Sequence, residues 1–394
     1  MADRNRPNRG LRIGILANSM LQSEGFYAGG NVHTLEVAER WSDAGNEVVF
    51  FAPPFAEGML RRRFPHLRVV VMPDLPARFG GRVVRFLFRA AAACTRRHEL
   101  SACDALFASS PFLPDTVPLL VAWRPARTIF LAHVLAAPWR RPGSLFWNSL
   151  ASINELLGLL TTRIAADTLV TCSELVARQL LRRGLHQRCF VTTNGVEHVE
   201  HRSDGIRSGA VCVARLHHAK GAEDLIHIWR LVADSLPDAV VHMVGDGEPA
   251  FRAHLVDLVA SLGLERNVSL EGSVDAATRD RLLGQAAVFV FPSHEEGWGI
   301  AVAEALAAGL PCVTYDLPVF REVFPHGRLA VSVGDRAGFA HEVIALLRDP
   351  AQRDELAALG RESVRKCTWA RAAEIDARAI AVAREKKFEA KSAA

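Results

Sequence analysis

The sequence has few cysteines, no long uninterrupted apolar segment and little net charge, and each absence excludes a class of protein. The seven cysteines are widely spaced and form no Cys-x-x-Cys pair, which argues against a disulfide framework or zinc site and for free thiols in a reducing compartment. A net charge of +4 on 394 residues does not suggest a dedicated nucleic-acid-binding protein. The most apolar later stretch, around 145–171, is interrupted by polar and charged residues, so we expect no transmembrane helix.

The N-terminus also lacks an apolar signal segment. The first ten residues, MADRNRPNRG, are basic and polar and lead directly into a predicted strand, so we expect a cytoplasmic protein. With 49% apolar and 23% charged residues, the composition is that of a globular protein. The length suits about two domains.

Short apolar runs alternate with helical patterns along most of the chain. Runs that are apolar throughout are typical of strands buried on both faces. They lie at 11–18, 47–52, 68–72, 104–109, 128–133, 168–173 and 189–193, and again at 210–215, 239–245, 267–272, 287–293, 312–316 and 328–333. Strands that alternate with helices form parallel sheets with helices on both faces. The sequence therefore predicts an α/β protein with two doubly wound, Rossmann-like domains facing across a cleft.

The domain boundaries follow from a polar, charged segment at 198–209, which we interpret as a linker. We expect an N-terminal domain over 1–197 and a C-terminal domain over 210–370. We expect a helix over 371–394 that can pack back on the N-terminal domain. Doubly wound sheets bind ligands beyond the carboxyl ends of their strands, so the informative residues should lie there.

Two loops at such strand ends contain glycine. Gly29 and Gly30 precede the first helix, where backbone N–H groups can bind an anion, although ordinary strand-to-helix loops often look the same. Gly245 and Gly247 form a Gly-x-Gly pair without a further glycine, which fits a simple turn equally well.

The segment ARLHHAKG (214–221) carries two cations after the first strand of the second half. Arg215 and Lys220 can clamp a diphosphate, the guanidinium as a planar fork and the ammonium as a point charge. Two such cations can also be solvated surface charges.

The segment SHEEGWGIAVAEALAAGLPC (293–312) contains the most informative residues. Glu296 lies at the mouth of a turn formed by Gly297, Trp298 and Gly299, where a helix begins and can offer backbone N–H groups. Glu304 lies on that helix among apolar neighbours, where an unpaired charge is costly. Vicinal hydroxyls of a ribose or sugar would satisfy it, and a nearby arginine is the alternative. Glu295 we interpret as a solvated charge.

Together, RLHHAKG, VGDGE, LEGSV and SHEEGWGIAVAEALAAGLPCV resemble the signature of retaining nucleotide-sugar glycosyltransferases of the GT-B fold, family 4 type. Glu296 and Glu304 match that family's pair of glutamates separated by seven residues. The resemblance covers most of residues 11–375. It is specific over 210–325 and loose over 54–165, where such enzymes usually recognise the acceptor. Trp298 departs from the family's more usual phenylalanine.

The resemblance implies a role for each matching position. Arg215 and Lys220 would bind the donor diphosphate, and Glu304 the ribose hydroxyls. Glu296, with the amides of residues 297–299, would bind the transferred sugar. The remaining implied positions are Gly30, with Gly29, at the phosphate, His133 near the sugar, Gly245 among the donor-binding residues, and the backbone of Gly272, Ser273 and Val274 at the base.

The implied reaction moves a sugar from an NDP-sugar, with UDP or GDP as the nucleotide, to an unidentified small metabolite, glycan or lipid. The sequence contains no Asp-x-Asp pair, so we expect no metal requirement, with the two cations stabilising the leaving group. A sugar-nucleotide epimerase and a non-catalytic binding module remain alternatives. The basic amphipathic segment 82–97, with Arg82, Arg85 and Arg89 on one face, fits either a peripheral membrane contact or an ordinary packed helix.

Overall fold

The computed structural model describes residues 10–19, 29–76, 81–132, 137–141, 143–185, 188–197 and 207–392. The described chain forms two compact units. Unit 1 contains the N-terminal part to residue 195 together with the C-terminal residues from 368, and unit 2 contains residues 196–367. The short segment 137–145 is also grouped with unit 2, although it follows a strand of unit 1 in the sequence.

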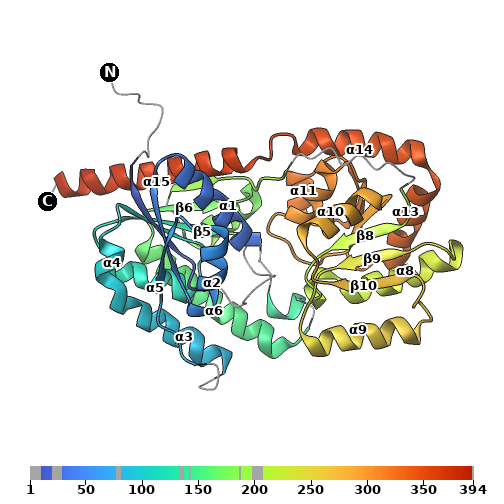
Figure 1. Ribbon diagram of the computed structural model, residues 1–394, viewed down its shortest axis with the longest axis horizontal. Coiled ribbons are helices and arrows are strands. Elements are labelled where there is room, and N and C mark those ends of the chain that lie inside the picture. Colours follow the sequence, from blue (N-terminus) through green and yellow to red (C-terminus); the bar gives the residue numbers. More distant parts are fainter. Residues whose placement is uncertain are drawn as a thin grey trace. The chain divides into compact units, whose positions relative to one another are not determined.

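Unit 1 contains a parallel sheet of seven strands in the order β3-β2-β1-β4-β5-β6-β7. The strands are β1 (Arg12–Leu16), β2 (Glu47–Ala52), β3 (Arg68–Val71), β4 (Ala105–Ala108), β5 (Ala126–Leu131), β6 (Thr168–Thr171) and β7 (Arg188–Val191). The helices are α1 (Gly29–Asp43), α2 (Pro54–Arg63), α3 (Arg82–Ala92), α4 (Arg97–Ser101), α5 (Leu113–Val121), α6 (Leu145–Ala165), α7 (Glu174–Arg182) and α15 (Trp369–Ser392) (Figure 1).

Unit 2 contains a parallel sheet of six strands in the order β10-β9-β8-β11-β12-β13. The strands are β8 (Ala210–Val213), β9 (Val241–Val244), β10 (Val268–Gly272), β11 (Val288–Phe291), β12 (Cys312–Tyr315) and β13 (Arg328–Val331). The helices are α8 (Ala222–Ser235), α9 (Pro249–Ser261), α10 (Ala276–Gln285), α11 (Ile300–Ala307), α12 (Pro318–Val323), α13 (Arg336–Arg348) and α14 (Pro350–Val364).

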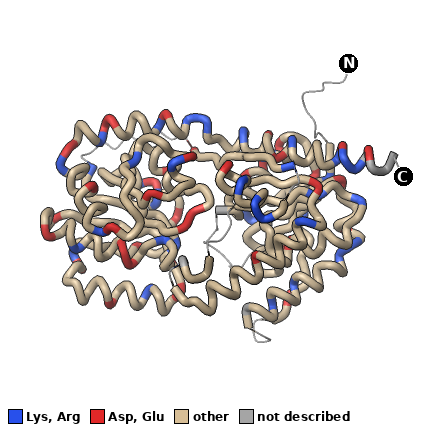
Figure 2. The backbone as a smooth tube through the Cα atoms, turned by 180° about the vertical axis from the view of Figure 1, so that it is seen from behind, with Lys and Arg blue, Asp and Glu red and all other residues tan. Residues whose placement is uncertain are grey.

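The two sheets confirm the predicted α/β class of two doubly wound domains. Each predicted apolar run overlaps a strand. The strands β4, β6, β11 and β12 are buried along their whole length, as is typical of strands covered on both faces. Charges of both signs are spread along both units, with neither sign gathered on one of them (Figure 2).

The C-terminal helix α15 completes the core of unit 1. Figure 1 shows it (red) beside α1, β5 and β6. The indole Nε1 of Trp41 on α1 donates to the carbonyl of Ala373 at 3.0 Å. His33 lies fully buried between Asn194 and Asp376, with 2.8 Å from each ring nitrogen to a side-chain oxygen. The contacts of Trp41 with Ala373 and of His33 with Asp376 join residues more than 300 positions apart into one unit.

The helix that we predicted as basic and amphipathic is α3, and two of its arginines face the protein rather than solvent. Arg85 and Arg89 both pair with Asp74, at 2.8 and 2.9 Å, and the Arg89 side chain is almost fully buried. The part of the chain that the structure describes holds no helix with both the length and the apolarity needed to cross a membrane.

Candidate functional site

The predicted site residues of unit 2 gather at the carboxyl ends of two neighbouring strands, β8 and β11. Lys220 ends a short 3-10 helix (His218–Lys220) after β8, and Glu296 follows β11. The Lys220 ammonium lies 2.5 Å from Glu296 Oε1, and the Ser293 hydroxyl donates to the same oxygen at 3.0 Å. Both charged side chains are largely buried. The structure therefore joins into one ion pair two residues that the sequence assigned separately to phosphate and sugar.

The turn after Lys220 fits the loop after β11 because of a glycine. Gly221 has φ of +70°, and a Cβ there would lie 1.9 Å from the carbonyl oxygen of Pro292. His294 N donates to the carbonyl of Ala219 at 2.9 Å, which joins the two loops by their backbones. Only a residue without a side chain permits this approach, so Gly221 sets the position of Lys220 against Glu296.

Gly299 and Trp298 form the start of α11. Gly299 has φ of +103° and precedes the helix, and a Cβ there would lie 2.6 Å from the Phe320 ring. Trp298 is buried, with its ring edge-on to Phe324 at 5.1 Å between centroids. The indole is therefore a core side chain. The turn from Gly297 to Gly299 would bind a ligand through its backbone N–H groups.

Glu304 has an arginine neighbour. Its side chain is 29% exposed, and Arg279 Nη1 on α10 lies 3.5 Å from Glu304 Oε1. Burial raises the pKa of the Glu304 carboxyl, and the Arg279 charge opposes that effect. Of the two interpretations left open by the sequence, the arginine partner is present, although at a distance that leaves the carboxylate able to accept stronger hydrogen bonds.

The remaining unit 2 positions lie at the same edge of the sheet. Arg215 is exposed, two residues beyond β8. Gly245 N donates to the carbonyl of Gly272 at 2.8 Å, so these two glycines join the ends of β9 and β10. Ser273 is exposed and Val274 half-buried just before α10.

The positions in unit 1 are Gly29, Gly30 and His133. Gly29 and Gly30 begin α1, and the Thr34 hydroxyl donates to the carbonyl of Gly30 at 3.0 Å. His133 lies outside the described residues.

One prediction is wrong: Glu295 is not a solvated charge. Its side chain is 17% exposed and pairs with Arg141 at 3.0 Å. Arg141 follows a short 3-10 helix (Pro138–Arg140) in the segment that groups with unit 2. The sequence holds no local signal for this pair because its members are 154 positions apart.

The pKa of His217 reflects the positive charges around it. Loss of hydration lowers the pKa of His217 to about 4, and Arg215, His218, Lys220 and Arg141 add to the effect. Its Nδ1 accepts a hydrogen bond from Ala219 N at 3.1 Å, as only an unprotonated nitrogen can. Arg141 therefore lies near enough for its charge to act on His217 together with those of Arg215 and Lys220.

A network of hydrogen bonds around the buried Asp224 carboxylate supports the loop that follows β11. Asp224 on α8 accepts from Tyr315 at 2.8 Å and from Arg336 at 2.6 Å, and His294 Nε2 lies 2.9 Å from it. Burial alone would raise the pKa of Asp224, but these hydrogen bonds outweigh it and lower the pKa well below its usual value. Asp224 thereby holds His294, the residue next to Glu295.

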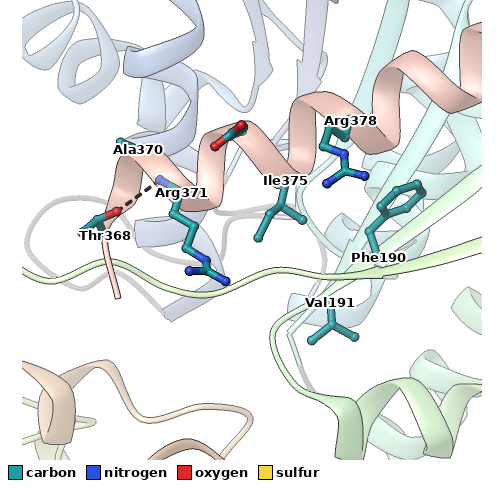
Figure 3. Close-up of a pocket in the computed structure, with 8 residues that line it drawn as sticks. Phe190, Val191, Thr368, Ala370, Arg371, Ile375 and Arg378 are labelled. Atoms are coloured by element: carbon teal, nitrogen blue, oxygen red, sulfur yellow. Dashed lines mark hydrogen bonds between the residues drawn. The ribbon is translucent and has the colours of Figure 1, made fainter. Parts of the chain in front are cut away.

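A hollow of about 690 Å³ lies elsewhere, in unit 1. Figure 3 shows Phe190, Val191 and Ile375 along it, with Arg371 and Arg378 at its sides. None of the predicted site residues lines it. Over the described part of the chain, no group of three or more His, Cys, Asp or Glu side chains is placed to hold a metal ion.

Two family models match the chain on either side of the unit boundary. One, described as Glycosyltransferase Family 4, matches residues 27–200, and the other, described as Glycosyl transferases group 1, matches residues 197–363. The chain belongs to the GT-B glycosyltransferases of the family 4 type. The resemblance seen in the sequence is thereby confirmed.

Individual relatives agree with this family. The phosphatidyl-myo-inositol mannosyltransferase of Mycobacterium leprae is 37% identical over 154 residues, which are 38% of this chain and 40% of that protein. The corresponding enzyme of Mycolicibacterium smegmatis is 26% identical over 91% of this chain and 90% of its own. Alignments with the first three curated relatives span 40%, 39% and 49% of their lengths.

The solved structures show the same fold. Anabaena HepE in complex with UDP and glucose superimposes with a TM-score of 0.72 at 16% identity, over 98% of this chain and all of that one. The lipopolysaccharide glycosyltransferase WaaG gives the same TM-score at 14% identity, over 93% of this chain and 99% of its own.

Proposed function

We propose that the chain transfers a sugar from an NDP-sugar, with UDP or GDP as the nucleotide, to an acceptor that is a small metabolite, a glycan or a lipid, with retention of the anomeric configuration. The observation that carries the proposal is the ion pair of Lys220 and Glu296 at the carboxyl ends of β8 and β11. It lies beside the turn that precedes α11, and the N-terminus of a helix can offer backbone N–H groups to an anion.

Each side chain has a chemical task in this proposal. Lys220 and Arg215 neutralise the diphosphate as the glycosidic bond breaks, a stabilisation that is greatest when the donors are already in place. Glu296, held by Ser293, accepts hydrogen bonds from hydroxyls of the transferred sugar. His133, Gly29 and Gly30 are proposed to contribute from unit 1 near the sugar and phosphate.

The acceptor nucleophile loses its proton to a donor phosphate oxygen in this scheme, and attack occurs on the face from which the diphosphate leaves. No protein nucleophile is then required. Metal independence follows from the cations, because Arg and Lys supply the charge that a divalent metal supplies in other glycosyltransferases.

The donor proposal is supported by neighbouring structures whose titles name UDP and UDP-glucose. The acceptors that the relatives are named for range from phosphatidyl-myo-inositol to L-malate and 2-deoxystreptamine, so no single acceptor class is favoured.

Peripheral contact with a membrane from the cytoplasm is a secondary part of the proposal. Val83, Val84, Leu87 and Phe88 on α3 are exposed. Because Asp74 pairs with Arg85 and Arg89, apolar contact rather than charge would dominate there. Flotation with anionic vesicles tests this part alone.

The donor and reaction are tested in two steps. Thermal shift against UDP, GDP, ADP and their sugars should show stabilisation by UDP or GDP, of about 2.7 kcal/mol at a hundred times the dissociation constant. Proton NMR of a successful transfer should then show the donor's anomeric configuration in the product, with and without EDTA. Epimerised donor without transfer would make the chain an epimerase, and binding without any turnover a binding module.

A further inference from the structure

The helix α6 (Leu145–Ala165) packs on its own unit through a face of largely polar and small residues, and its opposite face is apolar. The packed face is buried through Asn148, Glu155, Gly158, Leu159 and Thr162. Gly158 lies against the backbone at Pro111, and the Thr161 and Thr116 hydroxyls are 2.6 Å apart. These contacts hold α6 against the start of α5 and the loop before it.

The opposite face is exposed and apolar. A stripe of six residues runs along it at alternating steps of four and three: Phe146, Leu150, Ile153, Leu157, Leu160 and Ile164. Five of them are 43–73% exposed, and Leu150 is half-buried. Trp147 and Leu156 flank the stripe and are 57% and 59% exposed. A contiguous exposed apolar patch of this kind is typical of an interaction surface.

The spacing of the stripe indicates what covers it. Alternating steps of four and three are the seam of helices that pack side by side with knobs in holes. The stripe spans five turns, or about 27 Å at 1.5 Å per residue. A bound membrane would not need this regular register, and interfacial helices carry lysine and arginine on the polar face. The polar face of α6 packs on unit 1, and the helix contains only one basic residue, Arg163.

We infer that α6 is the contact surface of a homodimer, in which the stripe of one chain packs against the stripe of a second copy. The stripe is self-complementary because it is uncharged, so two copies can meet across a two-fold axis without opposing like charges. At the observed exposures, the six side chains of the stripe together with Trp147 and Leu156 have an accessible apolar surface on the order of 800 Å². A standard stable interface buries about 800 Å² on each partner.

The association is measured by sedimentation velocity of the full chain over a wide concentration range. We expect twice the mass of one chain at the upper concentrations. Leu157→Glu and Leu160→Glu should each raise the dissociation constant at least about tenfold, because each places a charge at the centre of the seam. The matched control is Val256→Glu, which adds the same charge at a 49% exposed position on α9 and should leave the dimer unchanged.

A second measurement locates the contact. With a two-fold axis across the middle of the stripe, position 153 of one copy faces position 157 of the other. Mixing Ile153→Cys with Leu157→Cys should give a disulfide-linked dimer under oxidation, whereas the wild type with its seven native cysteines should not. A protein that remains monomeric at every concentration overturns the inference. So does a dimer that both glutamate variants leave intact. Monomers that bind anionic vesicles through Leu157 and Leu160 would assign the face to a membrane instead.

Discussion

Lys220 Nζ and Glu296 Oε1 lie 2.5 Å apart, between the loops that follow β8 and β11, and the Ser293 hydroxyl also donates to that carboxylate. The contacts with Lys220 and Ser293 keep the Glu296 side chain oriented before any donor arrives. The ion pair also means that Lys220 must serve two anions, the carboxylate and the proposed diphosphate, so its loss should affect more than one step.

We therefore expect Lys220→Ala and Arg215→Ala each to weaken the binding of UDP or GDP, whichever the chain takes. A hydrogen bond to a charged group contributes about 1.5–3 kcal/mol, so each affinity should fall at least roughly tenfold. Isothermal titration calorimetry measures this. Lys366→Ala, an exposed lysine of the same unit, is the control. Unchanged nucleotide affinity in both site variants would falsify the phosphate assignment.

A second prediction concerns the pair of Arg141 and Glu295, at 3.0 Å. Because Glu295 adjoins Glu296, we expect Arg141→Ala to lower the transfer rate more than nucleotide affinity. Glu295→Gln should lower the transfer rate as well. A double-mutant cycle on kcat should show a coupling of at least about 0.5 kcal/mol, as is usual for residues in contact. If the effects of the two substitutions on kcat simply add, the contact between Arg141 and Glu295 does not contribute to transfer.

The sequence predicted the two sheets and the positions of the candidate unit 2 residues at the ends of their strands, because both have local signals. Buried parallel strands are continuous apolar runs, and the site residues follow those runs within a few positions. The residues that it missed lack such signals. Arg141 lies 154 positions from Glu295, and His33 lies 343 positions from Asp376. The backbone amide of Trp298 stays a predicted ligand contact, and the burial of its ring against Phe324 has no local signal in the sequence.

A third prediction tests the packing of α15 against α1. His33 and Asp376 are both fully buried, and over the described residues Asp376 Oδ1 has no hydrogen-bond partner. Removing one member leaves its buried partner without this hydrogen bond, which typically costs about 1–3 kcal/mol. His33→Leu and Asp376→Leu should therefore each destabilise the chain, and the double variant less than the sum. Urea unfolding measures this, with Arg371→Ala on the same helix as control. A fully additive double variant would contradict direct coupling.

The fourth prediction is a dependence of stability on pH through Asp115. Burial raises the pKa of Asp115 to about 6, although Ser110, Ser19 and Ser109 donate hydrogen bonds that lower it. In the unfolded chain the carboxyl titrates near 3.8. Between these values only the folded state holds the proton. The contribution of Asp115 to stability is thus full below the unfolded pKa and is lost as the pH rises through about 6.

The size of that loss is about 3 kcal/mol for a shift of about two pKa units. Relative to Asp115→Asn, the wild type should accordingly lose stability as the pH rises from about 4 to about 6.5. Urea unfolding across this range provides the comparison, and the exposed Asp43→Asn serves as control. A constant difference between wild type and Asp115→Asn at every pH would show that the carboxyl has the same pKa in both states.

The last prediction concerns Glu304, the acid in an otherwise apolar helix. Arg279 lies 3.5 Å away, too far to satisfy the carboxylate alone, and the side chain is only 29% exposed. We expect two ribose hydroxyls of the donor to provide the missing hydrogen bonds. A 2′-deoxy donor should then bind the wild type at least roughly tenfold more weakly than the ribose donor. In Glu304→Gln this preference should shrink, because the charge that favoured the hydroxyl is gone.

The variant Arg279→Ala tells whether the ribose or the arginine is the partner of Glu304. It should keep the preference for the ribose donor if the carboxylate contacts the sugar directly. Calorimetry of both donors with all three proteins gives the cycle. Equal affinities of the ribose and deoxyribose donors for the wild type would assign Glu304 to Arg279 alone, as a structural ion pair between α10 and α11.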